Sequence, residues 1–271
     1  MSILQKALGA WLLASLSLAI LAGCGGSGGS NAGGPATPVS GGDANPTGLW
    51  QGTFTPTDGK SRAFNAVVAP DGQFAGVVAS SGGNGRFLFG TSDTTSSEFN
   101  ATGTVFVRPG EALLPNGQTS DPITVVDGKV VERVSLTGAY SGGGEAASFV
   151  LTYDGNTARG ASLAAVAGVY GTYPPPPPGT AFDAVLTASG DQLTLATSAG
   201  CNGAGTIAVF DATLNIYRWS LRIAPCNGAP EISVAGLATL TDDPRGGIGN
   251  LLSLYGATTS RDQSLIISFS K

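Results

Sequence analysis

The chain of 271 residues contains no histidine, a single methionine and only three cysteines. Without histidine, neither a Ser-His-Asp nor a Cys-His catalytic arrangement can form, and imidazole cannot ligate a metal. So few sulfur ligands also argue against haem, copper and zinc centres. We therefore expect neither a metal site nor a cofactor.

Charged side chains are also scarce, at 11% of the chain. The 18 acidic residues outnumber the 13 basic ones, and the isoelectric point is about 4.6. Proteins that bind nucleic acid need a basic surface, which this composition does not supply. We therefore expect no nucleic-acid partner.

Residues 1–24, MSILQKALGAWLLASLSLAILAGC, have the order of a secretory signal. The positive Lys6 precedes an uncharged, mostly apolar stretch from Ala7 to Ile20, and small residues follow. This stretch is shorter than the roughly 20 residues that a membrane-spanning helix needs. Residues 1–23 are therefore predicted to be a signal peptide.

The end of this segment, Leu21-Ala22-Gly23-Cys24, resembles the lipobox of bacterial lipoproteins. The resemblance implies cleavage before Cys24 and attachment of diacylglycerol and a further acyl chain, such as palmitate, to that cysteine. Several acyl chains, at about 0.8 kcal/mol per buried CH₂, make a stable bilayer anchor. Gly25 rather than aspartate follows, which in enterobacteria-like sorting implies the outer membrane. The alternative is an ordinary signal peptide with an incidental cysteine.

Residues 24–46 form a Gly/Ser/Pro-rich segment without aromatic residues. Such a composition cannot bury a core and predicts a disordered linker. A flexible coil of this length spans roughly 25 Å on average, so it can hold a folded part away from the membrane.

The remainder of the chain contains two similar halves. Ala63–Val67 recurs 118 residues later as Ala181–Val185, and Gly72 meets Gly190 at the same offset. Two further matches keep this order: Gly48–Phe54 with Gly168–Tyr173 after one deletion, and Ser148–Leu151 with Ser264–Ile267. We expect homologous domains at 47–160 and 161–271. A single barrel of about 225 residues is the competing interpretation.

The local pattern of both halves is strand and turn. Asx-Gly pairs, a strong hairpin signal, separate runs of β-branched or alternating residues. In Tyr217–Ile223 the residues Tyr217, Trp219 and Leu221 share one face with Ile223, as in a strand buried on one side. The only helical piece expected is Ser162–Val166. The fold class is therefore all-β, with two small antiparallel barrels or sandwiches.

Gly48-Leu49-Trp50 resembles the G-x-W motif of lipocalin- and avidin-like barrels. In those families the tryptophan lies on the first strand and closes one barrel end. The second half has Tyr170 at the corresponding place. The tandem layout behind a lipobox is also similar to surface lipoproteins of the transferrin-binding kind, whose domains include eight-stranded barrels. These resemblances imply an architecture and not a function.

With Cys24 acylated, Cys201 and Cys226 remain as the one intramolecular pair in an exported protein. They flank a segment that is expected to form two strands. The chain has no C-x-x-C motif, so we predict a structural disulfide within the second domain.

The alternatives to a binding role depend on carboxylates and on a cavity. A glycoside hydrolase needs two facing carboxyl groups in a cleft, and Asp242-Asp243-Pro244 stands where acidic residues usually form a turn. A small-ligand carrier would need a lipocalin-like calyx lined by alternate residues of Phe64–Val68 and Ile216–Ile223. Both alternatives stay open.

The run Pro174–Pro178 predicts a stiff polyproline II segment, which is either a rigid surface loop or a docking ligand. The candidate ligand or partner contacts are Trp50, Tyr170, Trp219, Pro174, Pro176 and Pro178, although Trp219 also fits a core position.

The sequence as a whole favours a non-catalytic lipoprotein of the cell envelope. Its partners are expected to be the lipid bilayer, through acylated Cys24, and an envelope protein. It is expected to act as a binding, accessory or structural module.

Overall fold

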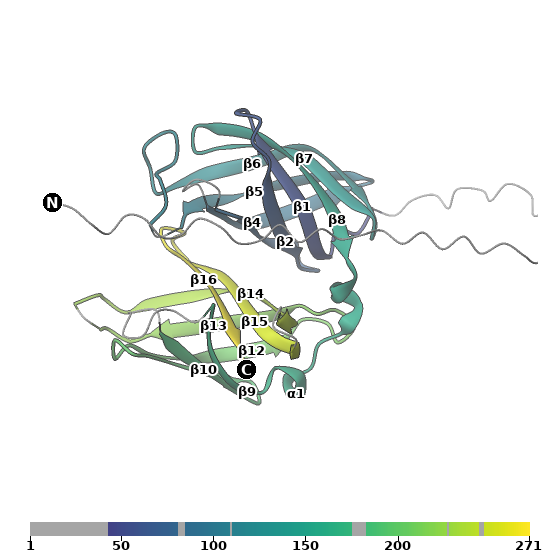
Figure 1. Ribbon diagram of the computed structural model, residues 1–271. Helices are drawn as coiled ribbons and strands as arrows, with labels where there is room; N and C mark the ends of the chain where they lie inside the picture. The colour runs from purple at the N-terminus through teal and green to yellow at the C-terminus, as the bar shows by residue number, and fades with distance from the viewer. Residues whose placement is uncertain (1–42, 81–84, 109, 175–182, 227, 244–246) are drawn as a thin grey trace, which may run out of the picture. The chain divides into compact units, whose positions relative to one another are not determined.

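The computed structural model describes residues 43–80, 85–108, 110–174, 183–226, 228–243 and 247–271. In these residues the chain forms sixteen β-strands and two short helices. The strands make two closed antiparallel barrels of eight strands each, the first purple to teal and the second green to yellow in Figure 1. The predicted fold class, two tandem β-barrels, is confirmed, and the single-barrel alternative is wrong.

The strands of the first barrel are β1 (Gly48–Pro56), β2 (Arg62–Val68), β3 (Gln73–Val78), β4 (Arg86–Thr95), β5 (Glu98–Val107), β6 (Ser120–Val131), β7 (Ser135–Gly142) and β8 (Glu145–Asp154). The strands of the second are β9 (Gly168–Tyr173), β10 (Ala184–Ser189), β11 (Gln192–Thr197), β12 (Asn202–Val209), β13 (Tyr217–Ile223), β14 (Ile232–Asp243), β15 (Gly247–Thr258) and β16 (Ser264–Ser270). The barrels are connected through the 3-10 helix η1 (Gly155–Arg159) and the helix α1 (Leu163–Val166).

The strands of each barrel follow one another around the wall in chain order. The first barrel closes where β1 pairs with β8, with Gly52 opposite Leu151, and the second where β9 pairs with β16, with Thr172 opposite Phe269. Each strand thus pairs with a neighbour on both sides, and the closure of the second barrel runs over Gly171–Tyr173 and Ser268–Ser270.

Helices play little part in the described residues. The expected short helix is present as α1, where the Ser162 hydroxyl caps the first turn by accepting from the Ala165 N–H at 3.1 Å. None of the helices in the described ranges is long and apolar enough to cross a bilayer.

The interior of the first barrel is filled by aromatic and aliphatic side chains. Phe54 makes edge-to-face contacts with Phe64 and Tyr140, with ring centroids 5.8 and 5.2 Å apart. The space left among them is about 30 Å³. Such a volume holds about one water molecule and no ligand of drug size.

The interior of the second barrel is a separate apolar cluster. The expected alternation in β13 is confirmed, because Tyr217, Trp219 and Leu221 are buried among Leu186, Phe269 and their neighbours. Arg218 and Arg222, which alternate with them on the opposite face of the strand, are exposed.

The first strand of each barrel begins with a glycine in the same backbone conformation. Gly48 and Gly168 both have φ of +150°. A Cβ at Gly48 would lie 2.5 Å from the Tyr153 ring, and one at Gly168 would lie 2.7 Å from the Lys271 side chain. Tyr153 packs edge-to-face on Trp50, with ring centroids 5.3 Å apart. The Lys271 Nζ lies 5.0 Å from the centroid of the corresponding tyrosine ring of β9. At Gly48 a Cβ would meet the packed Tyr153 ring, whereas at Gly168 it would displace the flexible end of Lys271; the positive φ favours glycine at both positions.

This equivalence corrects two details of the repeat. Two residues after Trp50 and Tyr170, Gly52 and Thr172 lie opposite the buried Leu151 and Phe269, so β1 and β9 align without the expected deletion. In the closing strands Leu151 corresponds to Phe269 and not to Ile267. A shift of two residues keeps the same face of a strand, so the hydrophobic pattern alone could not detect it.

Candidate functional site: a groove between the two barrels

The aromatic residues expected as contacts lie inside the barrels. Trp50, Tyr170 and Trp219 are 1%, 0% and 3% exposed. Their polar atoms have internal partners: the Trp50 Nε1–H donates to the Pro46 carbonyl at 2.8 Å, and the Tyr170 hydroxyl donates to the Val166 carbonyl at 2.7 Å. These three side chains pack the barrel cores, and Trp50 also borders the groove described below.

The proline run is described only in part. Pro174 is exposed and borders the groove described below. Pro176 and Pro178 lie outside the described residues, as does Cys24.

The outer faces of the barrels meet in a third apolar cluster. On β4, Leu88 points into the first barrel, so its neighbours Phe87 and Phe89 point outward, yet they are only 0% and 7% exposed. They are covered by residues of the second barrel, among them Leu237 of β14 and Ile216. Outward-facing side chains that are buried mark a barrel-to-barrel contact, and residues 40–271 accordingly form one compact unit.

A groove of about 920 Å³ lies between the barrels, and both contribute residues to its walls. This volume lies in the range of small-molecule sites, and it is some thirty times the space inside the first barrel. The groove is therefore our candidate functional site.

The wall from the first barrel combines carboxamides with apolar side chains. Gln51 of β1 and Asn65 of β2 lie directly opposite each other in the sheet, and both are exposed. The next outward pair, Leu49 and Val67, is buried in the cluster between the barrels. This wall thus changes from polar to apolar toward the barrel contact.

The wall from the second barrel carries a row of hydroxyl groups. Thr239, Ser253, Ser268 and Tyr173 occupy neighbouring positions on β14, β15, β16 and β9. The Ser253 and Ser268 hydroxyls are 2.9 Å apart and share a hydrogen bond. Tyr255 adds an aromatic ring to the same wall.

Two carboxylates lie at the rim. Asp154 accepts a hydrogen bond from the Asn156 N–H at 2.9 Å, at the start of η1. Asp242 accepts two hydrogen bonds from Arg159, at 2.7 and 2.8 Å, and one from the Gly249 N–H at 2.8 Å. These bonds, the arginine bond first, lower the pKa of Asp242, so this carboxyl stays ionised.

The same contacts bear on the expected turn at Asp242-Asp243-Pro244. The bond to Gly249 links the ends of the β14–β15 hairpin, as a turn residue would. Asp243 is buried and accepts a hydrogen bond from the Ser270 hydroxyl. Within the described ranges, no three residues among Cys, Asp and Glu gather as metal ligands.

A second polar cluster closes one mouth of the first barrel. Arg62 and Arg86 are 8% and 3% exposed, and Glu145 lies 3.9 Å from the Arg62 guanidinium. Arg86 donates to the carbonyls of Ala112 and Leu113 at 3.1 and 3.3 Å, and its burial lowers its pKa. The arginine thus fastens the loop between β5 and β6 over the barrel. We assign this cluster a structural role.

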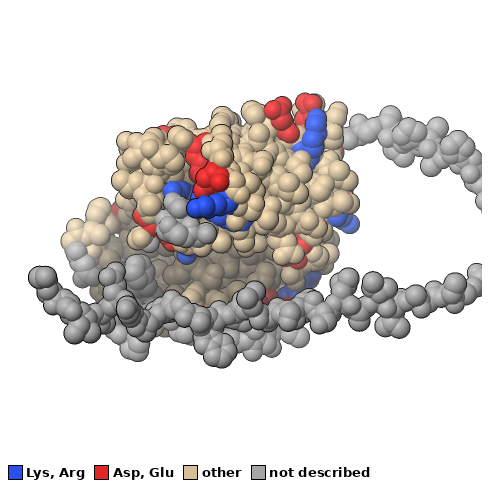
Figure 2. Space-filling view, turned by 45° about the horizontal axis from the view of Figure 1, so that its top comes forward, with Lys and Arg blue, Asp and Glu red and all other residues tan. Residues whose placement is uncertain are grey.

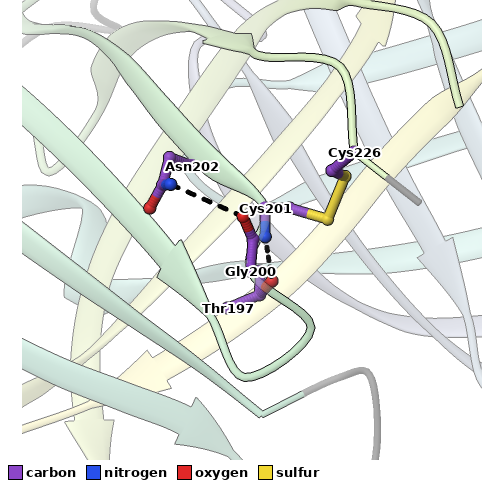
Figure 3. Close-up of a disulfide and its surroundings, with 5 residues drawn as sticks. All are labelled: Thr197, Gly200, Cys201, Asn202 and Cys226. Carbon is purple, nitrogen blue, oxygen red and sulfur yellow. Dashed lines mark hydrogen bonds between the residues drawn. A yellow bond between two sulfur atoms is a disulfide. The ribbon is translucent and has the colours of Figure 1, made fainter. Parts of the chain in front are cut away.

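The predicted disulfide between Cys201 and Cys226 is present, with an S–S distance of 2.07 Å (Figure 3). It links the turn before β12 to the loop after β13, at one end of the second barrel. The Cys201 N–H donates to the Thr197 hydroxyl at 3.0 Å, which holds the turn in place.

The groove residues were missed by sequence reasoning. Gln51, Asn65 and Ser268 alternate with inward-facing residues, as any solvent-facing residues of a strand do. One signal was available: Phe87-Leu88-Phe89 is apolar without alternation, which is typical of a strand covered on both faces. No protein-family model, no curated protein and no solved structure matches the chain.

Proposed function

We propose that the chain is a non-catalytic, ligand-binding lipoprotein of the bacterial cell envelope. Acyl groups on Cys24 anchor it, in the outer membrane, and residues 24–46 tether the two-barrel unit. The groove between the barrels holds a ligand of the envelope. The observation that carries the proposal is the groove of about 920 Å³ beside a first barrel that is filled.

The lipobox resemblance and the tether support the location. Leu21-Ala22-Gly23-Cys24 directly follows an apolar stretch, and a Gly/Ser/Pro-rich segment separates it from the first described residue, Asp43. A tether of this kind gives the folded unit reach without fixing its orientation.

The rim carboxylates support binding over hydrolysis. A glycoside hydrolase needs one carboxylic acid with a raised pKa to protonate the leaving group. The pKa of Asp242 is lowered instead, because Arg159 and the Gly249 N–H bond to its ionised form. This carboxylate therefore fits a fixed ion pair and not a general acid.

A carrier with a lipocalin-like calyx would use the barrel interior. Phe64 and Val68, which were expected to line it, pack in the filled core of the first barrel. Tyr217 and Trp219 do the same in the second. The groove therefore suits a ligand better than either barrel centre.

Photo-crosslinking in living cells tests the binding site. A diazirine amino acid replaces Asn65 in the groove or, as a matched control, the exposed Asn100 of β5 outside it. We expect a discrete adduct at position 65 and none at position 100. No adduct at 65, or the same adducts at both positions, would contradict a ligand site in the groove.

Acyl labelling tests the anchor. Cys24→Ser is expected to abolish incorporation of labelled palmitate and to release the protein from membranes. A variant that stays membrane-bound and unprocessed would show that the apolar segment itself is the anchor.

A further inference from the structure

We infer that the ligand of the groove is an uncharged oligosaccharide. This inference rests on the proposed binding function and adds the chemical class of the ligand. It follows from the hydrogen-bonding groups, the charge balance and the apolar surfaces of the two walls.

The hydroxyl row of the second barrel gives the first step. Thr239, Ser253, Ser268 and Tyr173 succeed one another across four adjacent strands. Adjacent strands lie about 4.8 Å apart, so the row is about 14 Å long. Each hydroxyl can donate as well as accept. Thr239 and Ser253 are only 2% and 6% exposed and form the floor of the row, so Ser268 and Tyr173, which are half-buried, present the accessible part. An extended ligand with many hydroxyl groups of its own matches such a row.

The wall from the first barrel also suits a ligand with many hydroxyl groups. Gln51 and Asn65 present their carboxamides side by side from β1 and β2, and Asn156 adds a third near the rim. A carboxamide carries two donors and one acceptor oxygen, so it can bind neighbouring sugar hydroxyls as both donor and acceptor. Both walls thus favour a ligand whose groups have mixed hydrogen-bonding character.

The charges of the groove balance. Asp154 and Asp242 carry negative charge, and Arg108 lines the same groove with positive charge. Asp242 is already neutralised by Arg159. On the face shown in Figure 2, uncharged residues dominate, and the charged residues occur in small clusters that include both signs. A strongly anionic or cationic ligand would therefore find no matching excess of charge.

The apolar residues of the groove fit the C–H faces of sugar rings. Tyr255 and Ile266 are partly exposed and lie opposite each other on β15 and β16. Leu49 and Val67 stand at the base of the other wall. An aromatic ring beside aliphatic surface offers a platform for the weakly apolar face of a pyranose.

The same features disfavour two other ligands. An extended peptide commonly binds by adding a strand to a sheet edge, and both barrels are closed. A lipid chain would desolvate the hydroxyl row and the carboxamides without giving them hydrogen-bond partners. A protein or lipid in the groove is therefore an outcome against the inference.

Binding of defined sugars to the full-length acylated protein tests it. The protein is kept in a sugar-free detergent and titrated with neutral hexasaccharides of glucose, mannose, xylose and N-acetylglucosamine, and with hexagalacturonate as the charged comparator. We expect saturable binding of at least one neutral sugar, and at least tenfold weaker binding of hexagalacturonate. Gln51→Ala combined with Asn65→Ala should weaken the neutral sugar at least tenfold, and Asn100→Ala should not.

The results separate this inference from the proposed function. No saturable binding of any neutral hexasaccharide, tighter binding of hexagalacturonate, or unchanged binding by the double variant would overturn the sugar assignment. If the crosslink at position 65 then yields a protein or lipid adduct, the groove is still a binding site and only the ligand class is wrong. If position 65 yields no adduct either, both proposals fail. Equal thermal unfolding of all variants excludes a folding defect as the cause.

Discussion

Asp71 and Arg218 lie 147 residues apart in the chain and form an ion pair between the two barrels. Asp71 is in the turn between β2 and β3, and Arg218 points outward from β13. The Arg218 guanidinium also lies 4.1 Å from the centroid of the Phe210 ring. The pair accompanies the apolar cluster between the barrels, so the two kinds of contact can be compared by mutation.

The apolar cluster is expected to dominate that contact. Asp71→Asn should lower the free energy of unfolding by about 0.2–1 kcal/mol, because both partners are partly exposed to solvent. Leu237→Ala should lower it by about 2–5 kcal/mol, because a fully buried side chain leaves a cavity. Urea unfolding measures both. A larger loss from Asp71→Asn than from Leu237→Ala would show that the ion pair holds the barrels together.

The sequence predicts the barrels better than it predicts their contact. The alternation of Tyr217, Trp219 and Leu221 specifies which face of β13 is buried, because a strand has a period of two. This alternation is sufficient to identify the residues that fill the barrel interior. The outward positions are different: Leu237 is covered and Val185 is 45% exposed, although both are apolar and face outward.

The groove could not be predicted for the same reason. Gln51 and Ser268 are ordinary solvent-facing residues within their own strands, and they share a site only because the barrels are packed together. The disulfide, by contrast, could be predicted, because elimination among three cysteines left one pair. The burial of Trp50 could not be predicted, because an aromatic residue on a strand has the same pattern in a core and at a binding surface.

The disulfide is expected to stabilise the protein by constraining the unfolded chain. Cys201 and Cys226 are 25 residues apart, and closing a loop of that length is worth about 3 kcal/mol on the chain-entropy model. Cys201→Ser combined with Cys226→Ser should lower the free energy of unfolding by about this amount. Denaturant unfolding of the oxidised, reduced and double-variant proteins measures it. A double variant as stable as the oxidised protein would contradict the expectation.

Arg86 is expected to hold the loop between β5 and β6. Its guanidinium donates to the Ala112 and Leu113 carbonyls, and the side chain is buried. Arg86→Met keeps most of the apolar stem but leaves these carbonyls without the donor, which should cost about 1–3 kcal/mol of stability. In the variant, hydrogen exchange of residues 110–119 should be faster than in the wild type, while exchange of β1 should change less. Unchanged exchange in this loop would indicate that the arginine serves only to fill the barrel mouth.

The ion pair of Asp242 with Arg159 is expected to make stability depend on acid. The pKa of Asp242 in the folded protein is lowered, while that of an aspartate in an unfolded chain is about 3.9. The ionised carboxylate therefore stabilises the fold fully above about pH 4, and this contribution disappears as the pH falls through the lower, folded pKa. Urea unfolding between pH 7 and pH 2 at constant ionic strength measures the loss.

Two variants assign that acid sensitivity to the pair. Asp242→Asn has no carboxyl group at this position, so its free energy of unfolding should fall less steeply with acid than that of the wild type. Arg159→Met keeps the Gly249 hydrogen bond but removes the largest cause of the lowered pKa, so its acid dependence should be intermediate. If all three proteins lose stability with the same slope, Asp242 is not a source of the acid dependence, and the rim carboxylate has no fixed partner in solution.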